Sequence, residues 1–350
     1  MVATAGAAAA ATTAAATAAA TTAGAGTAAA TTAPTAGAAT VDGRAEGEPV
    51  LVDSLSYYYS EQERDWGPPG EPLEPGELLA PGYRVVEHLR RGSRLDVYDL
   101  WSEERACRCV GKTLRPERAA DETAAGWLRN EGLLLTTLTH PHLVRGYETV
   151  LTSEPARPAV VTETLPGFTL GFLIDQHGRL RAMDVAVLGI QLCSALGYLH
   201  RQGWVHLDVK PSNVVEAGGR AVLLDLSLVC RVGDRSSGGT FDYLSPEQAR
   251  GDEMTPAADV WGLGITLYEA FSGTTPWAEF SHREKRGDGT RRYPQTESPA
   301  APLRTHRRMP AVLSRTVDAC LDQDPASRPT VQEVSDVLQT WSGVDPANAE

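Results

Sequence analysis

The hydrophobic pattern of this chain changes character once, at Pro166 and Gly167. Before this point the chain contains short runs with strand character: YRVVEHL, VYDLWSEE, CRCVGKTL, LVRGYETVLT and AVVTETL. One stretch among them, AAGWLRNEGLLLTTL, instead repeats its apolar residues at helical spacing. The first part of the chain is therefore predicted to be a set of strands with one inserted helix.

After Pro166 and Gly167, helical spacing dominates. One long helix carries an apolar stripe made of Val185, Leu188, Leu192, Leu196 and Leu199. A second helix is predicted from the N-cap Thr255 to Gly273, and a last one begins at a capping box of Thr330 and Glu333. The sequence thus predicts an α+β fold with a small β-rich lobe and a larger, mainly helical lobe.

Composition separates the ends of the chain from this folded part. Residues 1–40 hold no charged and no aromatic residue, which predicts a disordered tail; a signal peptide would need a basic region and a strongly apolar one. The next segment is rich in Pro and Gly, and its acidic residues outnumber basic ones ten to two, which is typical of a solvated linker. The predicted units are a tail 1–40, a linker 41–81, an N-lobe 82–165, a C-lobe 166–342 and a short tail 343–350.

The charge and the cysteines restrict the class of protein further. The linker carries much of the formal net charge of -13, and this acidity argues against nucleic acid as a partner. Five cysteines are scattered; Cys107 and Cys109 could share one face of a strand, but no second pair completes a zinc site. We read them as free thiols of a reducing cytosol, and find no run of about 20 apolar residues that predicts a membrane span. The expectation is a cytoplasmic protein.

Between the long helix and the strands that follow it stands WVHLDVKPSNVV, residues 204–215. This stretch resembles the catalytic loop of protein kinases, in the form used by serine/threonine kinases, with Asp208, Lys210 and Asn213 at the family's spacing. Further motifs match in the right order over residues 82–342, and several phrases are similar to bacterial members. They are Lys112, Glu131, Asp225, the SPE motif at Ser245 to Glu247, DVWGLG from Asp259, and Arg328.

The resemblance implies a two-lobed kinase fold and transfer of the ATP γ-phosphate to protein Ser or Thr hydroxyls, with Mg²⁺ as cofactor and Mn²⁺ as an alternative. In this family Lys112 would hold the α- and β-phosphates, and Glu131 would fix that lysine. Asp225 and Asn213 would be the metal ligands, since Mg²⁺ prefers hard oxygen donors.

The resemblance also assigns the residues around the transferred phosphate. Asp208 would accept or orient the proton of the substrate hydroxyl, and Lys210 would touch the γ-phosphate. Thr240, in the activation segment, would bridge these two side chains, which argues against a tyrosine kinase. Structural roles follow for four others: His206 as core scaffold, Asp259 as a backbone anchor, and Glu247 with Arg328 as a buried ion pair.

The ATP site implied by the resemblance consists of Leu89, Gly92, Val97, Val110, Lys112, Glu163, Leu165 and Val215. Val97 and Val110 would cover one face of the adenine and Val215 the other, while Glu163 and Leu165 would offer backbone groups. Ordinary strand packing explains the valines as well, and the two interpretations are compatible.

The sequence departs from the family's pattern near the catalytic residues. Leu207 replaces the arginine that usually receives the phosphate of an activated segment, which suggests that activity does not depend on that phosphorylation. The usual Phe-Gly after the metal aspartate is Leu226-Ser227, and Ser227 lacks the freedom of glycine. Val110 stands where alanine is usual and crowds the adenine roof slightly.

The largest departure is the stretch LRRGSRLDVY, Leu89 to Tyr98, which we call the phosphate loop. The family's three glycines fall on Arg90, Gly92 and Leu95, so only the middle one is kept. The three arginines of the loop, Arg90, Arg91 and Arg94, either add positive charge over the phosphates or simply point to solvent.

The sequence also allows functions other than a serine/threonine protein kinase. The altered loop and Leu226-Ser227 allow a pseudokinase, a binding or scaffold module with the same fold. A small-molecule phosphotransferase is a third reading, against which Lys210-Pro211, the SPE motif and Arg328 speak. Ser236 and Ser237 are candidate autophosphorylation sites, and the basic segment 281–310 is either a solvated insertion or a docking site. The substrate, the activating signal and the oligomeric state do not follow from the sequence.

Overall fold

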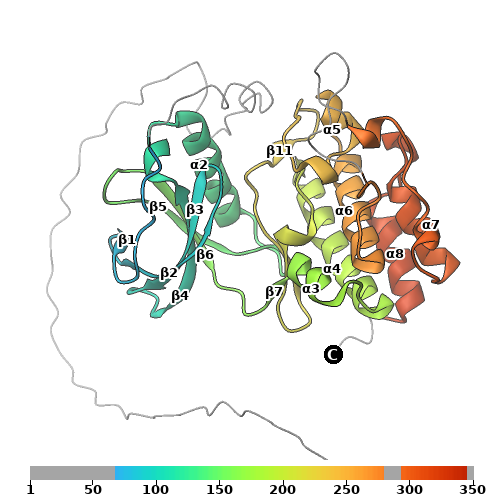
Figure 1. The fold of residues 1–350 in the computed structure, drawn as a ribbon, viewed down its shortest axis with the longest axis horizontal. Coiled ribbons are helices and arrows are strands. Elements are labelled where there is room, and N and C mark those ends of the chain that lie inside the picture. The colour runs from blue at the N-terminus through green and yellow to red at the C-terminus, as the bar shows by residue number, and fades with distance from the viewer. Residues whose placement is uncertain (1–67, 280–292, 345–350) are drawn as a thin grey trace, which may run out of the picture. The chain divides into compact units, whose positions relative to one another are not determined.

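The computed structural model describes residues 68–279 and 293–344. The predicted tail 1–40, most of the linker 41–81 and part of the basic segment 281–310 lie outside these residues. The described chain forms a β-rich N-lobe followed by a helical C-lobe (Figure 1). The α+β prediction is confirmed.

A six-stranded antiparallel sheet builds the N-lobe, in the order β1-β2-β3-β4-β6-β5. Its strands are β1 (Leu78–Ala80), β2 (Tyr83–Arg91), β3 (Leu95–Ser102), β4 (Cys107–Leu114), β5 (Gly146–Leu151) and β6 (Pro158–Glu163). The phosphate loop is the end of β2, its turn and the start of β3. Its Val97 lies opposite Lys112 of β4, so the sheet register places both at the same level.

The end of the predicted linker belongs to this sheet. Leu79 and Ala80 of β1 are 1% and 0% exposed, and the backbone N–H of Leu73 donates to the Tyr98 hydroxyl at 3.1 Å. The Pro- and Gly-rich composition of the segment hid this short apolar strand, because three residues are too few to show an alternation. The packed part of the chain therefore begins before residue 82.

Helix α2 (Glu122–Thr137) is the one inserted helix that the spacing predicted, and it packs on β5 and β6. Asp121 caps it by accepting a hydrogen bond from the Ala124 N–H at 3.1 Å. Leu128 and Leu135 lie on its buried face, and Glu131 lies among them at 2% exposure. A carboxylate in such a place needs a charged partner.

Six helices form the C-lobe within the described residues: α3 (Leu170–His177), α4 (Ala182–Arg201), α5 (Pro246–Arg250), α6 (Pro256–Ser272), α7 (Ala311–Cys320) and α8 (Val331–Ser342). Two small sheets also belong to the C-lobe: β7 (Phe168–Thr169) with β9 (Val214–Glu216) and β10 (Ala221–Leu223), and β8 (Trp204–Val205) with β11 (Cys230–Arg231). Short 3-10 helices are η1 (Pro116–Arg118), η2 (Pro211–Asn213), η3 (Phe241–Tyr243), η4 (Pro294–Thr296), η5 (Leu303–Thr305) and η6 (Pro325–Ser327).

The predicted helix ends are confirmed, with one difference in mechanism. Thr330 and Glu333 form both bonds of a capping box at the start of α8. Thr255 is the N-cap residue of α6, yet its side chain makes no capping bond; Pro256 at the first position supplies the start signal instead. Gly273 ends α6 in the left-handed conformation that favours glycine.

Helix α4 is long and apolar enough, by length and composition alone, to cross a membrane, a feature absent from the predictions made on the sequence. Half of its apolar window is buried within the protein, and it packs against α6 and α8. Helix α4 thus has the position of a core helix of the C-lobe.

Candidate active site

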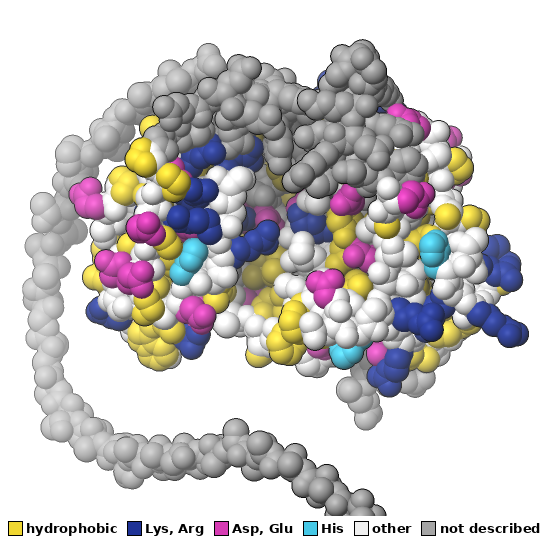
Figure 2. Space-filling view, in the orientation of Figure 1, with side chains coloured by type: hydrophobic (Ala, Val, Ile, Leu, Met, Phe, Trp, Pro, Cys, Tyr) yellow, Lys and Arg dark blue, Asp and Glu magenta, His cyan; other side chains and the backbone are white. Residues whose placement is uncertain are grey.

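A cavity of about 230 Å³ lies where the phosphate loop and α2 meet the catalytic loop. In Figure 2 the surface is hollowed between the two lobes, and Lys and Arg side chains gather on the N-lobe beside the hollow. The cavity is lined by Arg90, Gly92, Ser93, Arg94, Leu95, Val97, Lys112, Ala124, Trp127, Leu128, Glu131, Lys210, Asn213, Asp225, Ser227 and Leu228. Predicted residues from five separate motifs therefore share one space.

Lys112 joins the two lobes at the floor of this cavity. Its Nζ donates to both carboxylate oxygens of Glu131, at 3.0 and 2.9 Å, and to Oδ1 of Asp225 at 2.8 Å. The Glu131 side chain is 3% exposed and that of Lys112 16%. The predicted partnership of Lys112 and Glu131 is confirmed in its geometry.

The charges of this triad set its protonation. Burial works to lower the pKa of Lys112, but Asp225 and Glu131 outweigh it, so the pKa is raised and the amine stays charged. Burial, with help from the Asp225 charge, raises the pKa of Glu131 to about 7 despite Lys112. Burial would also raise the pKa of Asp225, yet Lys112 and the Ser227 N–H hold it below its usual range.

The backbone at Asp225 is held in the left-handed region, with φ of 61°. Its Oδ1 accepts a hydrogen bond from the Ser227 N–H at 3.2 Å, and the next side chain, Leu226, is 1% exposed in the main core. The buried Leu226 thus fills an apolar slot, and Asp225 lines the cavity.

Three side chains surround Asp208. Lys210 Nζ donates to Asp208 Oδ2 at 2.5 Å and to Thr240 Oγ1 at 2.5 Å. The Thr240 hydroxyl donates to Asp208 Oδ1 at 2.8 Å, and the Thr240 N–H approaches the same oxygen at 3.2 Å. The predicted bridge between Asp208, Lys210 and Thr240 is present.

Asn213 completes this group and is a candidate metal ligand together with Asp225. Its Nδ2 donates to the Asp208 carbonyl at 3.0 Å and to Oδ2 at 2.9 Å, which leaves the amide oxygen for another partner. Within residues 68–279 and 293–344 no cluster of three His, Cys, Asp or Glu could hold a metal by itself. Two oxygen donors beside a nucleotide fit Mg²⁺, which keeps waters and shares phosphate oxygens.

Buried partners fix the catalytic loop from below. Asp259 of α6 accepts hydrogen bonds from the N–H groups of His206 and Leu207, both at 2.8 Å, which confirms it as a backbone anchor. The His206 ring bonds the Leu224 carbonyl at 3.0 Å and the Asp208 N–H at 3.2 Å. His206 is therefore scaffold, as predicted.

Two further C-lobe predictions concern Glu247 and Leu207. Arg328 donates to both carboxylate oxygens of Glu247, at 2.6 and 2.9 Å, which confirms the buried ion pair. Leu207 is 5% exposed with φ of 66°, and its carbonyl accepts from Gln248 at 2.9 Å. Its side chain lies in an apolar cluster with Val205, Cys230, Met254 and Ala258.

This geometry agrees with comparisons to known proteins, which match residues 83–339 to the family described as protein kinase domain. The chain belongs to this family. It is 30% identical over 288 residues to the serine/threonine-protein kinase PknB of Mycobacterium tuberculosis, over 78% of this chain and 43% of the relative. A probable serine/threonine-protein kinase of Streptomyces coelicolor is 28% identical over 281 residues, or 72% of this chain and 42% of the relative.

The chain spans less than half the length of these curated relatives. Its fold is similar to the crystal structure of a double mutant of the Mycobacterium tuberculosis PknI kinase domain. The TM-score is 0.62 at 23% sequence identity, over 78% of this chain and all of the other. The likeness extends to the fold of a bacterial kinase domain.

The cavity contains only part of the predicted ATP site, and the rest of that site stays a prediction. Gly92, Val97 and Lys112 line the cavity. The other five predicted residues do not line it; they are Leu89, Val110, Glu163, Leu165 and Val215. The Glu163 N–H donates to the Arg145 carbonyl at 3.0 Å, and the Glu163 carbonyl accepts from the Thr162 hydroxyl at 3.4 Å.

The phosphate loop of the kinase domain separates its three arginines. Arg91 pairs with the buried Asp96, at 2.8 and 3.0 Å, and so points away from the cavity. Arg90 and Arg94 line the cavity, and the Arg94 guanidinium lies over the Trp127 ring at 5.3 Å. Trp127 was not predicted as a site residue, because its helical spacing also fits plain core packing.

Gly92 itself adopts no left-handed backbone, and a Cβ there would meet only the Leu95 carbonyl at 3.4 Å. The turn does not need the conformational freedom of glycine. Without a side chain, Gly92 leaves the backbone of the turn open to close approach.

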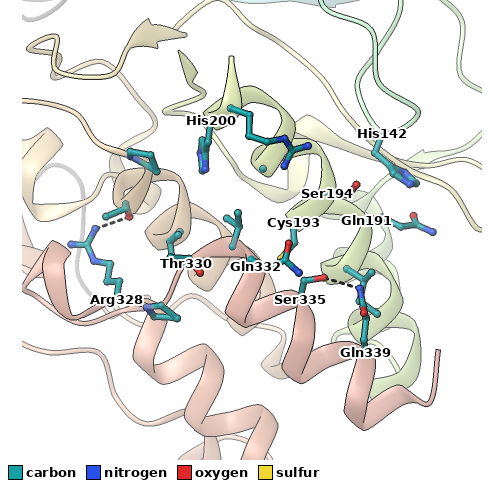
Figure 3. Close-up of a pocket in the computed structure, with 18 of the residues that line it drawn as sticks. His142, Gln191, Cys193, Ser194, His200, Arg328, Thr330, Gln332, Ser335 and Gln339 are labelled. Carbon is teal, nitrogen blue, oxygen red and sulfur yellow. Dashed lines mark hydrogen bonds between the residues drawn. The ribbon is translucent and has the colours of Figure 1, made fainter. Parts of the chain in front are cut away.

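A second, larger cavity of about 740 Å³ lies in the C-lobe between α4 and α8, and Figure 3 shows its lining. Several of its polar side chains are already hydrogen-bonded. Gln339 donates to the Ser335 hydroxyl at 3.1 Å. The Gln191 amide donates to the Gly219 carbonyl and accepts from the Ala221 N–H. None of the predicted catalytic residues lines it. This cavity is therefore separate from the candidate active site.

Proposed function

We propose that this chain is an ATP-dependent serine/threonine protein kinase that phosphorylates protein substrates. The observation that supports this most is the set of contacts around Asp208, in which Lys210 and Thr240 both touch its carboxylate. Lys112, Glu131 and Asp225 complete the charged positions; they line the cavity together with Lys210 and Asn213, the two residues that hold Asp208. Phosphoryl transfer depends mainly on positioning and on stabilising charge, and these residues supply both.

Each residue has a task that follows from its contacts. Glu131 holds the Lys112 ammonium in the cavity, where it can meet phosphate oxygens. Asp208 keeps a carboxylate oxygen next to Thr240, where a substrate hydroxyl could be oriented and its proton accepted. Mg²⁺, when held by Asp225 and Asn213, would neutralise charge on the phosphates.

We also propose that the activation segment needs no phosphate to reach its working position. Leu207 replaces a phosphate-binding arginine, and its apolar cluster with Cys230 and Met254 holds the base of that segment by packing. Gln248 supports this arrangement by donating to the carbonyls of Leu207 and Gly238, both at 2.9 Å. Ser236 and Ser237 would then be dispensable for activity.

We further propose a cytoplasmic location, which the five unpaired cysteines support.

The test is transfer of labelled phosphate from ATP with Mg²⁺, to the protein itself and to a generic protein acceptor, beside Asp208→Asn. Wild type should label both, and the variant should lose at least a hundredfold in rate, on the order expected for loss of a general base. Equal labelling by wild type and variant would end the enzyme proposal. The double variant Ser236→Ala, Ser237→Ala should transfer phosphate at the wild-type rate, because the activation segment is proposed to need no phosphorylation.

The second candidate is a pseudokinase that binds nucleotide or a partner without catalysis. The phosphate loop with one glycine and the Leu226-Ser227 pair favour it. A thermal-shift titration separates the two: no shift with ATP and Mg²⁺ supports a scaffold, and a shift without transfer supports a nucleotide-binding module.

A further inference from the structure

The turn of the phosphate loop is held by a residue outside the loop. Arg115 directly follows β4, and its Nη1 donates to the carbonyl oxygens of Gly92 and Ser93 at 3.3 and 3.4 Å. Its backbone N–H donates to the Arg94 carbonyl at 2.9 Å. The Arg115 side chain is 17% exposed, so these contacts are partly shielded from water.

These contacts orient two peptide units. A trans peptide is planar, so its carbonyl and its N–H point in opposite directions. The Gly92 carbonyl shares a peptide unit with the Ser93 N–H, and the Ser93 carbonyl shares one with the Arg94 N–H. Since both carbonyls face Arg115, both N–H groups point away from it. Gly92, Ser93 and Arg94 line the cavity and Arg115 does not, so the N–H groups point to the cavity side.

Arg115 is itself held by an anion. Its second terminal nitrogen pairs with Glu117, whose side chain is 7% exposed. Glu117 Oε2 also accepts a hydrogen bond from the Gly70 N–H at 3.1 Å. Burial works to raise the pKa of Glu117, but the backbone N–H groups and Arg115 outweigh it and lower the pKa, so the carboxylate stays charged.

Gly70 packs so closely on Pro116 that a side chain at position 70 would collide with it. A Cβ at Gly70 would lie 2.7 Å from the Cβ of Pro116, between Arg115 and Glu117. The segment that precedes the sheet thus packs on the residues that hold the phosphate loop. The contacts run from Gly70 through Glu117 and Arg115 to the loop turn.

We propose that Arg115 is a positioning residue for ATP, which turns the Ser93 and Arg94 N–H groups toward the phosphates in a loop that keeps one of three glycines. Glu117 and the segment at Gly70 hold Arg115 in place. The inference rests on the proposed kinase function and adds the residue that orders its phosphate contacts. Backbone N–H groups bind phosphate well only when their directions are fixed before the ligand arrives.

The test compares ATP, ADP and adenosine affinities, with KM and kcat, for wild type, Arg115→Ala and Arg115→Lys. Arg115→Ala should weaken ATP and ADP by roughly tenfold, equivalent to about 1.4 kcal/mol, and raise KM for ATP with kcat within about twofold. Adenosine affinity should not change, since adenosine has no phosphate. Arg115→Lys should recover only part of the lost ATP affinity. A lysine ammonium lacks the planar guanidinium, whose two terminal nitrogens contact the loop carbonyls and Glu117 at the same time.

Arg105→Ala is the matched control, because Arg105 is another half-buried N-lobe arginine that pairs with Glu148 away from the loop. Equal losses for ATP and adenosine, or equal ATP losses in Arg105→Ala and Arg115→Ala, would show a merely structural role and overturn the proposal. Should Arg115→Ala not fold, Glu117→Gln must show the same selective ATP loss at smaller size, and no loss there overturns it.

The outcomes also separate this proposal from the kinase function. Wild-type protein that binds no ATP overturns both. Wild-type protein that binds ATP without transferring phosphate overturns the catalytic function alone, and the ATP and adenosine affinities still decide the role of Arg115.

Discussion

The catalytic loop and the phosphate loop of this kinase domain are fixed in different ways. In the catalytic loop the reactive side chains bind one another: Asp208 contacts Lys210, Asn213 and Thr240 directly. In the phosphate loop the cavity-facing turn is held through its carbonyls by Arg115, which is not part of the loop. The side chains of the catalytic loop could be predicted because they form a sequence motif. The backbone groups of the phosphate loop are held by Arg115, which belongs to no motif and could not be predicted.

The largest effect should come from breaking the catalytic side of this comparison. Lys210→Ala removes the ammonium from both Asp208 and Thr240 and should lower kcat by roughly 10² to 10³. ATP affinity should stay within about threefold, because Lys112 and the phosphate loop are untouched. Steady-state kinetics and a nucleotide titration measure the two quantities. A fall in ATP affinity as large as the fall in kcat would contradict a mainly transition-state role for Lys210.

The next test asks whether the catalytic loop also depends on a distant support. Asp259→Asn leaves one oxygen for the N–H groups of His206 and Leu207. Burial works to raise the pKa of Asp259, but its hydrogen bonds with His200 and the His206 N–H outweigh this and hold the pKa below its usual range. We expect a loss of about 2 to 3 kcal/mol in the free energy of unfolding, measured in urea. Asp184→Asn, at an exposed ion pair, is the control and should leave the urea midpoint nearly unchanged.

A pH profile tests Glu131, which holds Lys112 in the cavity between the phosphate loop and the catalytic loop. The pKa of Glu131 is raised to about 7 by burial, so its carboxylate gains a proton as the pH falls through that value. Folding favours the neutral form, and that contribution to stability is lost as the pH rises through about 7. Activity has the opposite sign: kcat/KM for ATP should fall about tenfold from pH 8 to pH 6. The residual activity of Glu131→Gln should lack this slope.

The smallest effect is expected within the phosphate loop itself. Arg90→Gly restores one family glycine, and ATP affinity should change by less than about threefold, because Arg90 is a single charge at the edge of the cavity. Leu95→Gly is not an equivalent change, since Leu95 packs against two clusters of buried hydrophobic residues. Isothermal titration of the single variants measures this. A tenfold gain from Arg90→Gly, roughly 1.4 kcal/mol, would mean that the missing glycine limits binding after all.

The architecture and the catalytic side chains could be predicted from two kinds of signal in the sequence. The change of hydrophobic period at Pro166 and Gly167 predicted the two lobes, and the ordered motifs predicted Lys112 beside Glu131 and Asp208 beside Thr240. Both signals are local, because a period or a motif is complete within a few residues.

What the sequence did not reveal depends on contacts between distant segments. Arg115 and Gly70 meet through Glu117, and nothing in their local pattern distinguishes them from surface residues. The strand Leu78–Ala80 was missed since three residues carry too weak a pattern. The division of the loop arginines was also undetermined, because it depends on Asp96 and Trp127 as partners.

The left-handed backbone at Leu207 has a consequence for engineering this protein. Among the described residues, three that are not glycine have positive φ: Ala106, Leu207 and Asp225. Such a conformation costs a side-chain-bearing residue about 1 kcal/mol, so thermostability screens should accept Ala106→Gly in its surface turn. The same exchange at Leu207 would relieve that strain but empty a buried site beneath the activation segment, at a cost of roughly 2 to 5 kcal/mol. A glycine library built on backbone angles alone would therefore misjudge Leu207, where the strained residue is also the one that packs.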